Sequence, residues 1–330
     1  MKKYLILPVI ILAVSCSDKH IVQVDYGALA EKKVQLEREE LDEVFLPSDI
    51  YAAGQDVFIV NRDRNGNVLY RYRDSRNTGS YLNYGRSGKE FIFVDRSPRD
   101  NTDSTLFLYT DYTECTELAI KEDTVEIVSQ RRITDGLQNN VIVLDGSLVF
   151  YRALQESAPF CLYNTNSGEQ RFFGDFKDLP INVQTKDDRN NVSLSNSVYN
   201  DSLKVLMSFY ESAPVIRIYD MAGCRLVSEI RLTGLREQTA SVEDFYAGDS
   251  VIYFSRPVEA CGRVFVQMVN ATGNETPAST DILEVGWDGS ILGKYSLDQD
   301  CISYTVSQRG DFYGISVSDG LFFLCTGKLQ

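Results

Sequence analysis

Histidine and tryptophan are almost missing from this chain. Of its 330 residues, one is a histidine, His20, and one is a tryptophan, Trp287. Histidine is the base of Ser-His-Asp and Cys-His triads and a common zinc ligand. His20 precedes all of the strand-rich sequence, so these triads, His-ligated zinc sites and histidine-dependent metal lyases are excluded from the folded part.

Basic charge is also scarce. Lys and Arg number 33 against 47 Asp and Glu, which gives a formal net charge of −14. An acidic protein is repelled by nucleic acid and by anionic lipid, both of which are bound by neutralising phosphate. We therefore expect no nucleic-acid partner. The hydrophobic fraction of 43% is that of a folded protein and not of a disordered one.

No apolar run is long enough to span a membrane. Lys2 and Lys3 precede a ten-residue apolar run at 5–14, which Ser15 and Cys16 follow. This arrangement is typical of an export signal, and a spanning helix needs about 18 apolar residues. Because 12–16 resembles a bacterial lipobox, we expect a signal peptide at 1–15 and lipid attachment at Cys16. The lipid would then be the only membrane contact, on the periplasmic or surface face of the outer membrane in the cell envelope.

From about residue 46 the chain consists of short runs rich in Val, Ile, Tyr and Phe, separated by Gly, Asn, Asp and Ser. This pattern predicts an all-β domain at 46–330. Residues 16–45 are expected to form a lipidated tether and an N-terminal closing segment. Within it, 28–44 contains good helix formers, although part of it equally fits a strand followed by a loop.

A repeated turn follows an apolar strand end with Asn or Asp, then Gly, then another strand. Its copies lie at 60–68, 163–168, 219–223 and 285–289, with a weaker copy at 109–114. The spacing of 51 to 66 residues fits four short strands per unit, which predicts a six-bladed β-propeller, with a large β-sandwich as the alternative. The sixth blade would combine 301–324 with a closing strand at 21–26. The longest spacing predicts an insertion at 256–280 in the fifth blade.

Three features together resemble a known family. The lipobox, the strand at 58–61 and the segment 81–91, which contains Gly85, Gly88, Glu90 and Phe91, are similar to the TolB-like six-bladed β-propeller lipoproteins of Bacteroides and relatives. The usual Gly-Pro pair is missing from this segment. The resemblance implies the propeller fold and an envelope location, and it assigns no chemistry.

Site chemistry is sparse in the sequence. Asn61, Asp63, Asn65 and Gly66 resemble the start of a calcium loop, but Tyr72 stands at the twelfth position, where a bidentate Glu belongs. A hairpin turn explains the same residues without a metal. Carboxylates are abundant, but no pattern pairs them. We assign no catalytic residue, no cofactor and no metal.

Two kinds of modification are predicted. Six further cysteines permit 15 pairings; Cys301 with Cys325 is the simplest, and small buried hydrophobic residues are an equally good interpretation. Four Asp-Ser or Asp-Thr tripeptides look like the O-glycosylation motif of exported Bacteroides proteins. They place candidate sites at Ser104, Thr124, Ser202 and Ser250.

The leading hypothesis is a non-catalytic, lipid-anchored envelope propeller. Its blade-connecting loops would bind a protein partner or a glycan or peptide ligand. The alternative is a carbohydrate-active enzyme, a glycosidase or lyase, that uses Asp or Glu, or Tyr and Arg, at the central channel. Acids that converge in one apolar pocket with raised pKa values would favour the enzyme, and scattered acids would favour binding.

Overall fold

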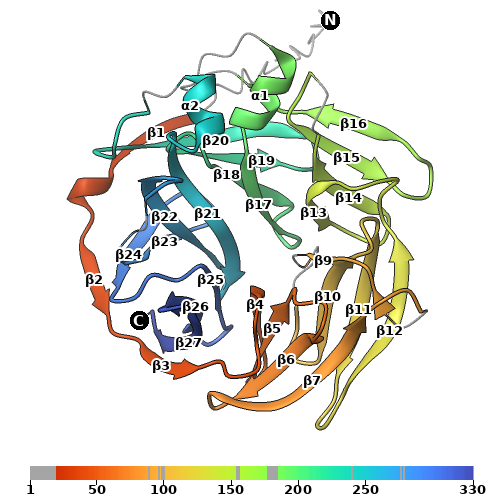
Figure 1. Cartoon of the computed structure of the whole chain (residues 1–330). Helices are drawn as coiled ribbons and strands as arrows, with labels where there is room; N and C mark the ends of the chain where they lie inside the picture. The colour runs from red at the N-terminus through yellow and green to blue at the C-terminus, as the bar shows by residue number, and fades with distance from the viewer. Residues whose placement is uncertain are drawn as a thin grey trace, which may run out of the picture.

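Six sheets surround a central axis like the blades of a propeller in the computed structural model (Figure 1). The structure describes residues 20–87, 90–95, 97, 101–153, 157–176, 185–238, 241–275, 277 and 279–329. The predicted six-bladed β-propeller is confirmed. The signal peptide and Cys16 lie outside the described residues.

Each blade contains four mainly antiparallel strands, and three blades carry a fifth. Blade 1 is β4 (Pro47–Ala53), β5 (Asp56–Asn61), β6 (Asn67–Arg73), β7 (Arg76–Tyr84) and β8 (Glu90–Phe91). Blade 2 is β9 (Val94–Asp95), β10 (Thr105–Thr110), β11 (Glu114–Ile120) and β12 (Val125–Arg132). Blade 3 is β13 (Asn139–Val143), β14 (Leu148–Arg152), β15 (Phe160–Asn164) and β16 (Gln170–Phe173).

The second half of the ring has the same plan. Blade 4 is β17 (Ser195–Asn200), β18 (Val205–Tyr210), β19 (Val215–Asp220), β20 (Arg225–Thr233) and β1 (His20–Asp25). Blade 5 is β21 (Val251–Ala260), β22 (Arg263–Thr272), β23 (Asp281–Val285), β24 (Ile291–Leu297) and β2 (Glu31–Val34). Blade 6 is β25 (Ser303–Val306), β26 (Asp311–Ser318), β27 (Leu321–Lys328) and β3 (Glu37–Glu40). Short helices η1 (Tyr26–Ala28), α1 (Lys186–Val192) and α2 (Val242–Ala247) connect strands.

The hydrophobic core is divided into six clusters, one between each pair of neighbouring blades. Successive side chains of a strand point to opposite faces, so a strand between two blades must be apolar on both. In β5, Val57 and Ile59 pack toward blade 6, whereas Phe58 and Val60 pack toward blade 2. This explains why middle strands such as β5 read as almost unbroken apolar runs.

The N-terminal segment runs along the outside of blades 4, 5 and 6 (Figure 1). β1 and β2 pair in parallel with the outer strands β20 and β24, and β3 pairs antiparallel with β27. The expectation that 21–26 closes the ring is wrong, because the fourth strand of blade 6 is β3. The region 28–44 forms the strands β2 and β3, so its strand alternative is confirmed and the helix is wrong, since sheet edges offer main-chain partners and most of its side chains are exposed.

Two other details differ from the sequence prediction. The repeated turns of blades 1 and 2 join the second and third strands, whereas those of blades 3, 4 and 5 join the third and fourth. The same turn sequence therefore occurs at two different positions within a blade. The expected insertion at 256–280 is mostly the long β21–β22 hairpin, and further length lies in the connection 234–250 that carries α2.

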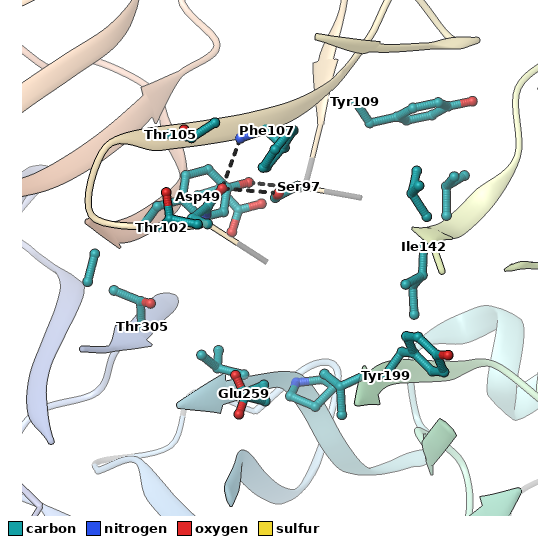
Figure 2. Close-up of a pocket in the computed structure, with 18 of the residues that line it drawn as sticks. Asp49, Ser97, Thr102, Thr105, Phe107, Tyr109, Ile142, Tyr199, Glu259 and Thr305 are labelled. Atoms are coloured by element: carbon teal, nitrogen blue, oxygen red, sulfur yellow. Dashed lines mark hydrogen bonds between the residues drawn. The ribbon is translucent and has the colours of Figure 1, made fainter. Parts of the chain in front are cut away.

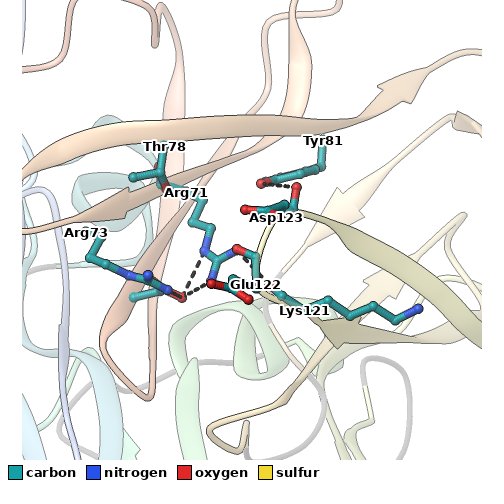
Figure 3. A network of polar contacts seen from close by, with 8 residues as sticks. Arg71, Arg73, Thr78, Tyr81, Lys121, Glu122 and Asp123 are labelled. Carbon is teal, nitrogen blue, oxygen red and sulfur yellow. Dashed lines mark hydrogen bonds and ion pairs between the residues drawn. The ribbon is translucent and has the colours of Figure 1, made fainter.

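A buried ion network joins blade 1 to blade 2 (Figure 3). Arg71 and Arg73 both donate to the carboxylate of Asp56 in blade 1. Nη1 of Arg71 also donates to two main-chain oxygens of blade 2, those of Lys121 at 2.8 Å and Glu122 at 2.7 Å. Burial alone would raise the pKa of Asp56, but the hydrogen bonds from Arg73 and Arg71 outweigh it and lower the pKa. Asp56 is therefore held as an anion.

Blade 4 repeats this device with other residues. Arg217, which is fully buried, donates from Nε to Oε2 of Glu229 at 2.8 Å and from Nη1 to the main-chain oxygen of Asp175, which follows blade 3, at 2.7 Å. Arg231 donates to the other oxygen of Glu229 at 2.7 Å. Each network satisfies a buried carboxylate and the main chain of the adjacent blade together.

In the described part of the chain no helix is long and apolar enough to cross a membrane.

Candidate functional site

A cavity of about 870 Å³ lies at the centre of the ring (Figure 2). Its volume is within the roughly 300–1,000 Å³ of small-ligand sites. All six blades contribute to its wall, mainly through β4, β13, β17, β21 and β25 and through the segment that leads into β10. The lining extends from the middle of the inner strands to the turns that follow them, including those at Gly54, Gly146, Lys204 and Arg309.

Two irregular inner strands shape the wall. The β13–β14 ladder shifts register between Asn139 and Ile142, and the β21–β22 ladder shifts between Ser255 and Val258. At each shift one residue has a positive φ, 51° at Asn140 and 49° at Arg256. This conformation costs a non-glycine residue about 1 kcal/mol, and such strain is often retained at functional sites.

Both strained residues reach out to other blades. Oδ1 of Asn140 accepts from the main-chain N of Ser197 at 2.9 Å, which ties blade 3 to blade 4. Nη1 of Arg256 donates to Oδ1 of Asp49 in blade 1 and to Oγ of Ser303 in blade 6, each at 3.1 Å. The bulge in β21 thus places a cation where three inner strands meet.

Acids outnumber bases on the cavity wall. Of the charged lining residues, three are basic and seven are acidic, a difference of −4. The basic residues are Lys204, Arg256 and Arg309, and the acidic ones are Asp49, Asp95, Asp103, Glu117, Asp145, Asp201 and Glu259. Lys204 donates to Asp201 at 2.7 Å, and Arg256 donates to Asp49 at 3.1 Å, so each of these two cations already contacts a carboxylate. The cavity therefore favours cationic or neutral occupants over anions.

Asp145 shows how one of these acids is held. The main-chain N–H groups of Ser147 and Leu148 each donate to its Oδ1 at 2.9 Å. These hydrogen bonds lower the pKa of Asp145, and the bond from Ser147 has the largest effect. A general acid needs a raised pKa, so this carboxyl is suited to attract a cation and not to protonate a leaving group.

Aromatic rings lie among the charged groups of the wall. Tyr51, Phe107, Tyr109, Tyr199 and Tyr304 come from four different blades. The hydroxyl of Tyr51 accepts from the main-chain N of Ser97 at 2.9 Å, and that of Tyr304 donates to the main-chain O of Arg256 at 2.6 Å. The hydroxyls are thereby fixed, and Figure 2 shows Phe107 and Tyr199 on different sides of the cavity.

The calcium-like tract forms a hairpin turn between β5 and β6. Oδ1 of Asn61 accepts from the main-chain N of Leu46 at 2.9 Å, and Oδ1 of Asp63 accepts from the main-chain N of Asn65 at 3.0 Å. The Asp63 oxygen stabilises the turn itself, and the Asn61 oxygen holds the residue that precedes β4. Across the residues that the structure describes, no three His, Cys, Asp or Glu side chains are grouped to hold a metal ion.

The predicted modification sites differ in accessibility. Ser104 and Ser202 are exposed, next to the cavity-lining Asp103 and Asp201, and Thr124 is half-buried in a turn. Ser250 is only 5% exposed and is therefore a poor target in the folded chain. Cys16 lies outside the described residues.

Sequence reasoning missed the residues of the cavity wall. Arg256 carried a usable signal, because Ser255-Arg256-Pro257 interrupts an apolar strand with a charge and a residue that cannot donate to a ladder. Asp49 and Asn140 carried no comparable signal, since their roles depend on contacts with other blades.

Two solved structures share the fold. A member of the DUF4221 family from Bacteroides vulgatus has a TM-score of 0.57 at 11% identity, over 89% of this chain and 98% of its own. A protein of Bacteroides fragilis predicted to be exported has a TM-score of 0.56 at 10% identity, over 95% of this chain and 100% of its own. No family model matches the sequence, and a search of curated proteins gives no match. At these identities the likeness is one of fold.

Proposed function

We propose that the chain is an exported, lipid-anchored binding protein of the cell envelope, similar to TolB-like propellers, that holds a short basic peptide segment in its central cavity. The observation that carries the proposal is the acid-rich wall to which all six blades contribute. Exposed carboxylates such as Asp103 attract the charged ends of lysine or arginine, while the apolar part of the wall receives their aliphatic stems.

Calorimetric titration tests this function with two probes, acetyl-trilysine amide and acetyl-triglutamate amide. We expect saturable binding of the lysine peptide and none of the glutamate peptide. Asp103→Asn should weaken the lysine peptide at least threefold, because it removes one cavity carboxylate and keeps the side-chain volume. Glu243→Gln, an exposed acid on α2 outside the cavity, is the matched control and should change nothing. Equal weakening by both variants would refute the cavity as the site.

A glycan is the second candidate ligand, favoured by the mixture of aromatic and carboxylate side chains on the wall. The same lining is the natural place for the glycosidase or lyase alternative. Incubation with oligosaccharides, followed by chromatography, separates the two: retention without cleavage supports binding, and cleavage products support an enzyme. For a protein partner, in-cell crosslinking with a Cys16→Ala control asks whether capture depends on the anchor.

O-glycosylation is proposed at Ser104 and Ser202, where the hydroxyls are exposed beside the cavity. A glycan at either position would flank the bound ligand. Intact-mass and peptide mass spectrometry of protein from the native host should find both modified and Ser250 bare. Bare Ser104 and Ser202 would refute the proposal.

A further inference from the structure

Two cysteines meet in the core of blade 6. Cys301 lies two residues before β25, Cys325 lies in β27, and both are fully buried in the same hydrophobic cluster. Cys301 and Cys325 are both free thiols in this structure. The question is whether this pair is built for a bond that oxidation would form.

Gly314 shows how close the two side chains are. It pairs with Cys325 in the β26–β27 ladder, so the two residues present the same face of the sheet. A Cβ atom on Gly314 would stand 2.7 Å from Sγ of Cys301, which no real side chain tolerates. The sulfur of Cys301 therefore occupies the place that a side chain at position 314 would fill, directly beside Cys325.

The surroundings shift the pKa values of the two thiols in opposite directions. Their mutual hydrogen bond raises the pKa of Cys301 and lowers the pKa of Cys325. Sγ of Cys325 also lies 3.1 Å from Oγ of Ser316, and Arg38 on the closing strand favours its thiolate. A thiolate beside a protonated thiol is the arrangement in which disulfide exchange begins.

We propose that Cys301 and Cys325 form a structural disulfide in the exported protein. The thiolate of Cys325 attacks an external disulfide and releases one thiolate from it, which gives a mixed disulfide. The sulfur of Cys301 then loses its proton and displaces the second thiolate. Two protein thiols are thus oxidised, and one external disulfide, from an oxidoreductase or from oxidised glutathione, is reduced to two thiols.

The bond would fasten the start of the last blade to the strand that carries the ring closure. Cys325 pairs with Arg38 of β3, and Cys301 precedes the inner strand β25. Because both sulfurs are buried, the bond should form while blade 6 folds and should resist reduction afterwards. This proposal is independent of the ligand in the cavity.

Mass spectrometry tests the bond in the chain from residue 16, with Cys16→Ser, Cys224→Ser and Cys261→Ser removing the anchor and the two less buried thiols. The protein is refolded in a buffer of reduced and oxidised glutathione, denatured, alkylated without reduction and digested with trypsin. Cleavage after Arg309 puts Cys301 and Cys325 in different peptides. We expect these peptides to be linked, with Cys115 and Cys161 alkylated. Full alkylation of all four cysteines, or a link that involves Cys115 or Cys161, overturns the proposal.

A second measurement covers the case in which a variant folds poorly. The closed loop of about 25 residues predicts that the oxidised protein melts about 5 to 10 °C above the reduced protein. Cys301→Ser and Cys325→Ser should each abolish this difference while they melt close to the reduced parent. Equal melting of the oxidised and reduced parent contradicts the proposal, whatever the variants do.

Discussion

At the residue scale, Arg71 and Arg217 make the same kind of contacts. Each lies on the third strand of its blade, each meets a buried carboxylate, and each donates to a main-chain oxygen of a neighbouring blade. Arginine suits this place because its five donors form a planar fork and its charge is permanent. A lysine would lose the second set of hydrogen bonds, so these positions fix the contact between blades as well as the ion pair.

Removal of Arg217 should destabilise the protein strongly. Arg217→Met leaves Glu229 buried with one of its two arginine partners, and it leaves the main-chain oxygen of Asp175 without this donor. We expect a loss of about 3 to 5 kcal/mol in the free energy of unfolding, measured by urea denaturation. Arg225→Met, which breaks an exposed pair with Asp220, is the control and should leave the midpoint unchanged. A small effect at Arg217 would mean that Arg231 alone satisfies Glu229.

Asp56 should make the protein sensitive to acid. Its pKa in the folded chain is lowered, so its contribution to stability is present above the unfolded pKa of about 3.9 and is lost as the pH falls through the folded value. The melting temperature of the parent should therefore fall more steeply below pH 4 than that of Asp56→Asn. Asp319→Asn, at an exposed turn, should follow the parent curve. Parallel curves for the parent and Asp56→Asn would show that Asp56 is not linked to folding.

At the scale of elements, the sequence predicted the strands within the blades better than the edges of the sheets. Val57 to Val60 are apolar on both faces because two blades cover them, and this burial is visible as an unbroken run. The closing strand was misplaced because His20–Asp25 has a better strand pattern than Glu37–Glu40. An outer strand is held by main-chain hydrogen bonds to the free edge of a sheet. The side chains of β3, three glutamates and an arginine, do not reveal that pairing.

The same reasoning applies to the site. Unbroken apolar runs reveal which strands are covered on both faces, but not which polar side chains meet across the ring. Arg256 reaches Asp49 over more than 200 positions of sequence through a bulge that no local pattern encodes. The cavity could be expected from the fold class, whereas its residues could not.

Truncation separates β3 from the other N-terminal strands. A chain that begins at Gln35 lacks β1 and β2 but keeps β3, so blade 6 retains four strands and the ring stays closed. We expect it to unfold cooperatively, with a modest loss of melting temperature. A chain that begins at Leu41 lacks β3 and exposes the edge of β27, and it should not unfold cooperatively. Circular dichroism melting checks both, and a cooperative transition in the shorter chain would show that β3 is not the closing strand.

At the scale of the whole molecule, closure and charge are connected. Six clusters of similar design hold the blades together, and the blades leave a central space in which side chains from distant parts of the sequence converge. The chain as a whole carries −14, and the lining alone carries −4. A basic ligand is thus attracted at long range by the molecule and at short range by the wall.

These two ranges predict different responses to salt. The Debye length is about 10 Å at 0.1 M and about 3 Å at 1 M, so added salt screens the field of the molecule before it screens contacts within the cavity. For acetyl-trilysine amide, we expect the association rate to fall several-fold between 0.05 and 0.5 M NaCl, while the dissociation rate changes less. Stopped-flow fluorescence of a labelled peptide measures both rates.

Asp103→Asn should mainly raise the dissociation rate, because it removes a local contact and only one of many surface charges. If Asp103→Asn and added salt instead altered the same rate in the same proportion, the peptide would be held by the general acidity of the surface and not by the cavity.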